Sequence, residues 1–178
     1  MRPDTAPQLT IRDAVPEDLP ALVALSKKTF SDKFAHLYNP DDLVGFLEES
    51  HGAERYRAWL ADPENLIRVA EDEAGQMKAY LLCSPLALPA DDPKPGAVEL
   101  KRVYVDASLQ GRGLGSRFID EALAWARVRG APEIYLSVYS ENFEAQRLYA
   151  RLGWEKVGEF IFPVGRHEDL EFLLRLTL

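Results

Sequence analysis

The chain of 178 residues has few of the side chains that cross-link proteins or bind metals. Cys83 is its only cysteine, which excludes an intramolecular disulfide, and its place in an apolar run predicts a buried thiol. The three histidines are His36, His51 and His167. Because they lie far apart, with none of the spacings typical of zinc ligands, we expect no metal site.

Long apolar runs are also absent. The sequence begins with polar residues and prolines rather than with the apolar core of a signal peptide. No stretch approaches the ~20 apolar residues that span a bilayer. We therefore expect a cytoplasmic protein without a membrane partner.

Basic residues are outnumbered by acidic ones. Lys and Arg number 21 against 29 Asp and Glu, which gives a formal net charge of -8. Binding to nucleic acids of any sequence depends on basic side chains that neutralise phosphates, so we expect no nucleic-acid partner. The negative field is compatible with a cationic ligand, although an acidic surface also serves solubility.

The residues that are present predict a globular fold. Apolar residues make up 47% of the chain, and its length predicts one domain over residues 1–178. Strands are predicted at 9–12, 65–71, 76–82, 97–105, 133–139, 154–162 and 169–176. Helices are predicted at 16–30, 40–60 (one helix, or a pair broken at Gly52), 114–129 and 142–152, with a proline-rich loop at 85–96. This order predicts an α/β (α+β) fold with a mixed sheet of about seven strands and about four helices.

The most informative segment joins the strand at 97–105 to the helix after it. Glycines 111, 113 and 115 alternate directly before that helix. Glycine lets backbone N–H groups approach a ligand, and a helix start adds unpaired donors, so the segment predicts a phosphate or pyrophosphate site. No lysine follows as in a Walker A loop, and Ser116 replaces the last glycine of a dinucleotide-binding loop. A flexible turn before a helix is the alternative interpretation.

Residues 110–115, Gln-Gly-Arg-Gly-Leu-Gly, resemble the pyrophosphate loop of the GNAT N-acetyltransferases, with Gln110, Gly113 and Gly115 at its fixed positions. Residues 140–154 are similar to that family's second signature. The matching residues there are Asn142, Ala145, Tyr149, Gly153 and Trp154. The resemblance is sharpest over 97–160 and implies the acyl-CoA N-acyltransferase fold.

The resemblance implies that an acetyl group passes from acetyl-CoA to the primary amine of a small molecule by direct attack in a ternary complex. It implies that acetyl-CoA is held by the backbone of Val103, Tyr104 and Val105, by Asn142, and by Gln110, Gly111, Arg112, Gly113, Leu114, Gly115 and Ser116. It also implies a break in the strand at 97–105 that splays it from the next strand and opens a slot for the acetyl group.

The resemblance also implies two catalytic residues. Tyr149 matches the tyrosine that donates a proton to the departing thiolate, and Glu99 matches a position where many members keep a carboxylate base. From the residues alone, Tyr149 is a core aromatic of an amphipathic helix, and the alternative interpretation of Glu99 is an ordinary surface residue at a strand end. Strand alternation would place Glu99 on the same face as Val103 and Val105 unless a bulge shifts the register.

Residues 29–43 and the strand at 97–105 resemble the polyamine-acetylating, PaiA-like branch of the family. That resemblance implies acceptor contacts from Phe34, His36 and Tyr38. The nearby carboxylates are Asp41, Asp42, Glu48 and Glu49. They suit a polycation, or form a solvated helix face.

Two other functions stay open from the sequence. A non-catalytic acyl-CoA-binding or sensor module would keep the loop at 110–116 and need no acceptor. An acetyltransferase for protein N-termini or lysines would need an open groove beside the thioester. The apolar segment 172–176 suggests either a homodimer at a sheet edge or simple core packing.

Overall fold

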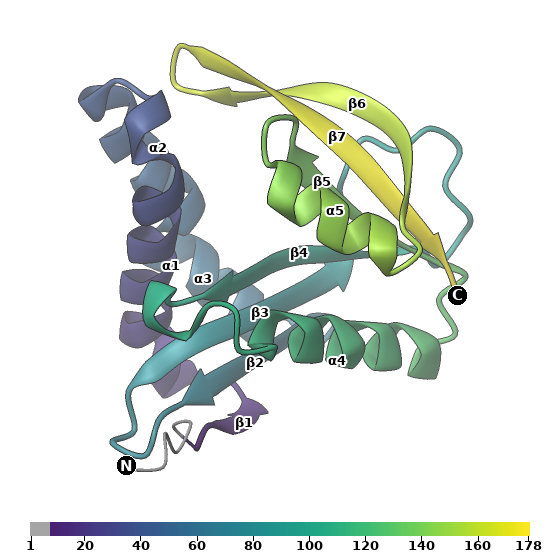
Figure 1. Cartoon of the computed structure of the whole chain (residues 1–178). Helices are drawn as coiled ribbons and strands as arrows, with labels where there is room; N and C mark the ends of the chain where they lie inside the picture. Colours follow the sequence, from purple (N-terminus) through teal and green to yellow (C-terminus); the bar gives the residue numbers. More distant parts are fainter. Residues whose placement is uncertain (1–7) are drawn as a thin grey trace, which may run out of the picture.

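The computed structural model describes residues 8–178, which form one seven-stranded sheet and five α-helices (Figure 1). The strands are β1 (Thr10–Asp13), β2 (Leu66–Glu71), β3 (Met77–Pro85), β4 (Val98–Val105), β5 (Glu133–Tyr139), β6 (Glu155–Val164) and β7 (His167–Thr177). The helices are α1 (Leu19–Phe34), α2 (Pro40–His51), α3 (Ala53–Ala61), α4 (Leu114–Val128) and α5 (Phe143–Arg151). The predicted α/β fold with a mixed sheet is confirmed.

The segment 40–60 forms the helix pair because the chain turns sharply at Gly52. An added Cβ there would lie 2.1 Å from the carbonyl oxygen of Glu48, so no larger residue fits this junction. Gly130 and Gly153 follow the ends of α4 and α5 with φ angles of 71° and 90°. Glycine is favoured at such positions, which is why the predicted helix ends agree with the structure.

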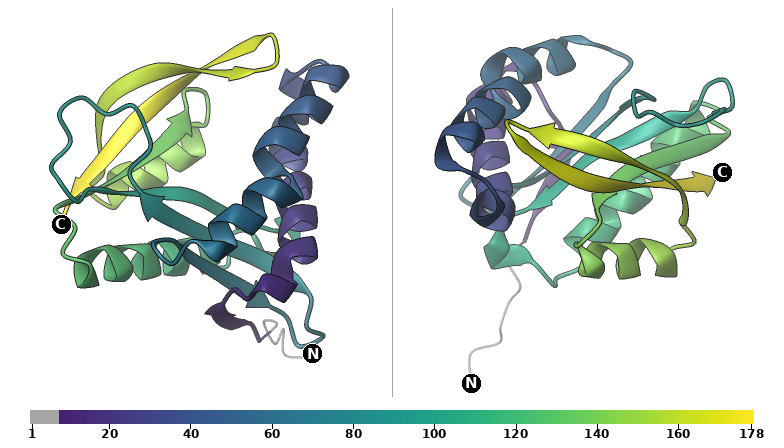
Figure 2. Two further views of the ribbon diagram at one scale, coloured as in Figure 1. Left: turned by 180° about the vertical axis from the view of Figure 1, so that it is seen from behind. Right: turned by 90° about the horizontal axis from the view of Figure 1, so that it is seen from above.

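The sheet opens between β4 and β5. Its order is β1-β2-β3-β4-β5-β7-β6, and only the β4–β5 pair is parallel. These two strands pair at just two positions, Val98 with Ile134 and Glu99 with Tyr135. Beyond them the strands diverge, so in the described chain the β5-facing edge of residues 100–105 has no strand partner. The β6–β7 hairpin then arches from β5 to the helices on the other side of the opening (Figures 1 and 2).

A bulge in β4 decides which way its side chains point. Leu82 of β3 pairs with Arg102 and the next residue, Cys83, pairs with Leu100, so no residue of β3 lies opposite Lys101. The alternation of side chains between the two faces of the sheet is therefore shifted by one residue across the bulge. The face toward α4 carries Val98, Leu100, Val103 and Val105.

Helices cover both faces of the sheet. The largest core cluster lies between α4 and strands β3, β4 and β5, where Phe118, Ile119 and Ala122 are almost completely buried. On the opposite face, Leu22 of α1 and Tyr56 of α3 pack against β2 and β3. Both layers hold β4 in place, so the strand that borders the opening has a fixed position.

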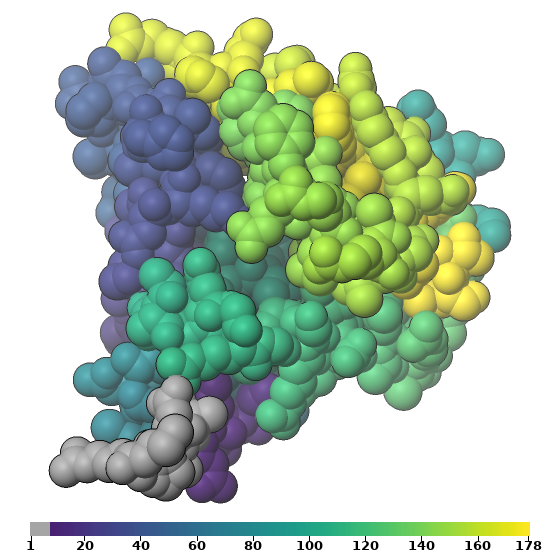
Figure 3. Space-filling model, in the orientation of Figure 1, coloured from purple at the N-terminus to yellow at the C-terminus, as the bar shows by residue number. Residues whose placement is uncertain are grey.

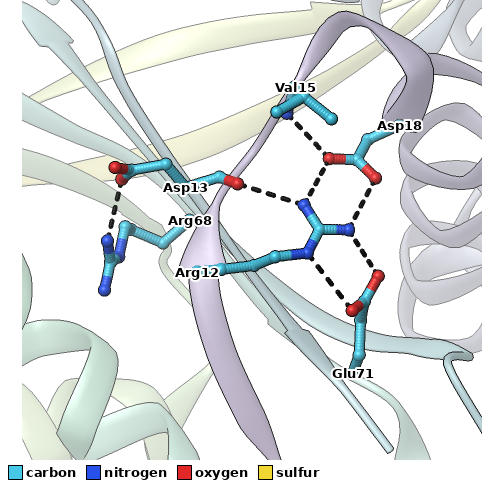
Figure 4. A network of polar contacts seen from close by, with 6 residues as sticks. All are labelled: Arg12, Asp13, Val15, Asp18, Arg68 and Glu71. Atoms are coloured by element: carbon cyan, nitrogen blue, oxygen red, sulfur yellow. Dashed lines mark hydrogen bonds and ion pairs between the residues drawn. The ribbon is translucent and has the colours of Figure 1, made fainter.

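A polar network ties the first strand to the first helix (Figure 4). The Arg12 guanidinium donates to both carboxylate oxygens of Asp18, at 2.8 and 2.9 Å, and to Glu71 of β2. Asp18 also accepts from the backbone N–H of Val15 at 2.8 Å. The hydrogen bonds from Arg12 hold the pKa of Asp18 below its ordinary value.

The apolar segment 172–176 lies inside the sheet, not at an edge. It belongs to β7, which pairs with β5 on one side and β6 on the other, and Leu173 and Leu174 are buried. Core packing therefore explains its composition, and the homodimer at this strand loses its basis. Within residues 8–178, no helix combines the length and apolarity needed to cross a membrane.

Candidate active site

The opening between β4 and β5 leads into a cavity of about 540 Å³. Strands β4, β5, β6 and β7 line it together with α1, α2, α3, α5 and the loop after β3. On the face seen in Figure 3, the surface is hollowed between α5 and the segment that leads into α4. The second sequence signature lines the cavity through Asn142, Ala145 and Tyr149, and β4 lines it as far as Tyr104.

The glycine-rich loop presents bare backbone at the start of α4. Gly111 and Gly113 have φ angles of 77° and 78°, and no atom lies within 4 Å of a Cβ built on either, or on Gly115. No side chain caps α4, whereas Asn39 caps α2 and Asn142 caps α5. The first N–H groups of a helix have no partner within it, so those of α4 are left for a ligand.

Other predicted loop residues support this arrangement. Gln110 donates from Nε2 to the Val105 carbonyl at 3.5 Å, which links the loop to the end of β4. Arg112 and Ser116 are exposed, and Leu114 is buried as an anchor of the helix start. The loop thus combines open amides with one free positive charge, as a diphosphate site requires.

Val103 and Tyr104 line the cavity wall, and Val105 ends the strand. The β5-facing backbone groups of this stretch have no strand partner in residues 8–178. Asn142 also lines the cavity. Its Oδ1 accepts from the Ala145 N–H at 3.3 Å, and its Nδ2 donates to no atom of the described chain.

Tyr149 lines the same cavity from α5. Its ring packs edge-on against Trp154 with the centroids 5.7 Å apart, which fixes its orientation. Burial raises the pKa of Tyr149 to about 12, and the nearby Tyr104 adds to the effect. The phenol is therefore protonated at neutral pH, and its hydroxyl makes no hydrogen bond within residues 8–178.

Glu99 faces the cavity but its carboxylate is already well bonded. Its Oε2 accepts from the backbone N–H groups of Ala87 and Leu88 at 2.9 and 3.1 Å. Its Oε1 pairs with Lys101 at 2.9 Å. The bulge at Lys101 places Glu99 here, and the side chain anchors the proline-rich loop to β4.

Glu171 is a second carboxylate in the cavity that the sequence analysis did not single out. It lies on β7 opposite Tyr139 of β5 and Phe160 of β6. Burial raises its pKa to about 7, and the neighbouring charge of Asp169 adds to the shift. In the sequence it is one acid among several in a hairpin, and no local pattern links it to Tyr149.

The residues predicted to contact the acceptor separate in the structure. Phe34 lines the cavity and meets Tyr139 edge-on at 6.2 Å. His36 is exposed outside the cavity lining. Tyr38, also outside the lining, donates a hydrogen bond to Asp169. The acidic residues at 41, 42, 48 and 49 do not line the cavity either.

A buried polar cluster borders the cavity on the side of α2 and α3. Arg102 donates from Nη1 to the Tyr56 hydroxyl at 2.8 Å and from Nη2 to the Ser50 carbonyl at 2.8 Å. His51 Nδ1 lies 3.1 Å from Arg102 Nη1 and 2.5 Å from Ser26 Oγ. Burial, with the charges of Arg102 and Lys27, lowers the pKa of His51 to about 2, so its imidazole is neutral.

Comparison with known proteins agrees with this geometry. Residues 31–154 match the family model described as "Acetyltransferase (GNAT) family". An uncharacterized N-acetyltransferase from the pepI 3' region of Lactobacillus delbrueckii subsp. lactis is 28% identical over 162 residues, which cover 91% of this chain and 93% of that protein. The spermine/spermidine N(1)-acetyltransferase of Bacillus subtilis is 37% identical over 73 residues, 40% of this chain and 48% of that one.

Among solved structures, the PaiA N-acetyltransferase of Thermoplasma acidophilum, determined with coenzyme A, has a similar fold. Its TM-score is 0.73 at 16% identity, over 96% of this chain and 99% of that one. The family model covers more than half of the sequence, and Asn142, Ala145 and Tyr149 of the second signature line the cavity. The chain therefore belongs to the GNAT family and is an acetyl-CoA-dependent N-acetyltransferase.

Proposed function

We propose that the protein transfers the acetyl group of acetyl-CoA to the primary amine of a small molecule, by direct attack within a ternary complex. The observation that carries this proposal is the cavity itself. It brings an unbonded phenol, Tyr149, and a carboxylate with a pKa near neutrality, Glu171, to the place where the sheet opens. A proton donor and a proton acceptor in one site are what an amine acetylation needs.

The chain offers a suitable site for the co-substrate, which supplies an activated thioester. The unpaired edge of β4 at Val103, Tyr104 and Val105 can pair with an extended amide-containing arm as a strand would. The amides of residues 113–116, with Arg112 close by, suit a pyrophosphate. The free Nδ2 of Asn142 provides one more donor toward the arm.

Tyr149 is proposed as the acid. Because its pKa is about 12, the phenol keeps its proton at neutral pH and donates a hydrogen bond where negative charge develops on the leaving sulfur. Its packing against Trp154 holds the hydroxyl in one direction before the reaction. The hydroxyl therefore needs no rearrangement during the reaction.

Two carboxylates compete for the role of base. Glu99 was the candidate from the family resemblance, but two backbone amides and Lys101 already bond to it. Glu171 has no such set of donors, and its pKa of about 7 suits removal of a proton from an ammonium group. We therefore assign proton removal to Glu171 and give Glu99 the role of holding the loop after β3 against the cavity.

The proposal is tested by mixing the purified protein with acetyl-CoA and a panel of primary amines, with release of free thiol as the readout. We expect thiol and N-acetylated amine to form in equal amounts. Tyr149→Phe is expected to lower kcat by about 10²-fold or more with a smaller effect on acetyl-CoA affinity.

Tyr135→Phe is the matched control, because this substitution also removes one phenolic hydroxyl but does so outside the cavity lining. A protein that binds acetyl-CoA tightly yet acetylates no amine in the panel would support the non-catalytic alternative. Turnover with peptides alone would support a protein acceptor.

A further inference from the structure

The cavity lining is rich in basic groups although the protein as a whole is acidic. Its charged side chains are Lys33, Arg55, Lys101 and Arg102 against Glu99 and Glu171. Lys101 and Glu99 pair with each other at 2.9 Å, and Glu171 is ionised only in part at pH 7. The remaining charge is positive, in contrast to the formal net charge of -8 of the chain. Such a lining disfavours a ligand with several ammonium groups.

Arg102 is one of these lining residues and has only neutral hydrogen-bond partners. It donates to the hydroxyl of Tyr56, to the carbonyl of Ser50 and to the imidazole of His51. In residues 8–178 no carboxylate lies within ion-pair distance of it. A cation held away from water without a counter-ion is unfavourable, so its position is best explained when a ligand supplies the negative charge.

Two guanidinium groups of the cavity lining lie near the ring of Trp59. The Arg102 guanidinium carbon lies 5.0 Å from the centroid of the Trp59 ring, and that of Arg55 lies 5.8 Å from the same centroid. Within the described chain Arg55 has no ion-pair partner, and the Nε–H of Arg102 donates to no atom. Two planar, positively charged groups with free N–H donors thus lie next to the same indole ring in the cavity lining.

Resting on the proposed acetyl transfer, we propose that the acceptor is an amine that also carries a carboxylate, bound by Arg102 with Arg55 beside it. A carboxylate matches the paired donors of a guanidinium better than any neutral group. The amine of the same molecule then lies in the part of the cavity lined by Glu171 and Tyr149. A polyamine would instead place a second ammonium group against two arginines.

The test compares acids with their uncharged amides. The panel holds ω-amino acids of three to six carbons and L-amino acids, each beside its primary amide, and the diamines of matching length. For the best pair we expect kcat/KM to be about tenfold or more higher for the acid than for the amide. The difference is expected in KM rather than in kcat, because the carboxylate lies away from the reacting atoms.

Two variants connect that preference to the arginines. Arg102→Gln is expected to reduce the acid-to-amide ratio to about one. Because Arg102 also links β4 to the α2–α3 junction, Arg55→Gln supplies a second variant, at an exposed residue without hydrogen bonds in residues 8–178. It is expected to lower the ratio about threefold. Arg57→Gln, two residues away on α3 and outside the lining, is the matched control and is expected to change nothing.

Binding of the same pairs to the CoA-loaded protein, measured by calorimetry, separates the two proposals. If no amine is acetylated but an acid binds in preference to its amide and Arg102→Gln abolishes that preference, the carboxylate site stands and the transfer to small amines fails. The carboxylate site is refuted, and the transfer stands, if amines are acetylated but diamines are preferred. The same holds if neither Arg102→Gln nor Arg55→Gln changes the acid-to-amide ratio of kcat/KM. No discrimination in either assay refutes the site as well.

Discussion

Replacing Glu171 by glutamine is expected to remove a specific pH dependence from the acetyl transfer. With a pKa of about 7, this carboxyl is half ionised at pH 7 and roughly one-tenth ionised at pH 6. In the wild type kcat/KM therefore rises about fivefold between pH 6 and pH 7 through this group and levels off above pH 8. Glu171→Gln lowers kcat/KM by about 10²–10⁴-fold and removes this acidic limb of the pH profile, the rise in kcat/KM between pH 6 and pH 8.

The same substitution has an expected effect on stability with a defined sign. The folded pKa of Glu171 lies above the ordinary value of 4.5, so folding favours the protonated form. Its ionisation thus lowers the free energy of unfolding as the pH rises from about 4.5 through 7. Above that range the loss is complete and amounts to at most ~3 kcal/mol. Glu171→Gln is expected to stabilise the protein at pH 8 by up to this amount and to have little effect near pH 4.

The measurements are kcat/KM by thiol release from pH 5.5 to 8.5 and urea unfolding at pH 4 and pH 8. Glu171→Asp, which keeps the carboxyl, is the conservative control and is expected to retain the limb at a reduced rate. Glu99→Gln is the contrasting control and is expected to keep the limb and lose stability. A Glu171→Gln protein with the wild-type pH profile would refute the assignment of the base.

Other predictions concern the network at β1 and the glycine-rich loop. Arg12→Ala is expected to lower the free energy of unfolding at pH 7 by about 1–3 kcal/mol. Because Arg12 lowers the pKa of Asp18, this loss of stability becomes smaller as the pH falls below about 4. Urea unfolding of both proteins at pH 7 and pH 3 measures it. Gly113→Ala is expected to cost about 1–2 kcal/mol of stability, since its φ is 78°, and to weaken acetyl-CoA binding in calorimetry. Gly45→Ala, in the middle of α2 with open space at its Cβ, is the control and is expected to stabilise by ~0.5–1 kcal/mol. Unchanged acetyl-CoA affinity in Gly113→Ala would contradict the proposed pyrophosphate site.

Local features of the fold follow from local sequence patterns. The helix ends at Gly130 and Gly153, the junction at Gly52 and the loop before α4 are each encoded within a few residues, because glycine conformation and helix capping are short-range effects. The order of strands and helices could be predicted for the same reason. The edge position suggested for segment 172–176 was wrong, since the order of strands in a sheet depends on contacts between distant segments.

The site itself could be predicted only in part. Tyr149 and the glycine loop stand in recognisable signatures, but Glu171 reaches the cavity because β7 inserts between β5 and β6. Arg102 and His51 are 51 residues apart and meet only when α2 packs against β4. The bulge at Lys101, which directs Glu99 into the cavity, depends on the register between β3 and β4. Side chains brought together by such tertiary contacts carry no mark in their own neighbourhood.

A structure of the protein with a non-reactive acetyl-CoA analogue tests the central claim most directly. We expect the diphosphate at the amides of residues 113–116, the extended arm along the free edge of β4, and the acyl carbon between Tyr149 and Glu171. An analogue bound elsewhere, or a complex in which that carbon lies beyond the reach of both side chains, would contradict the account.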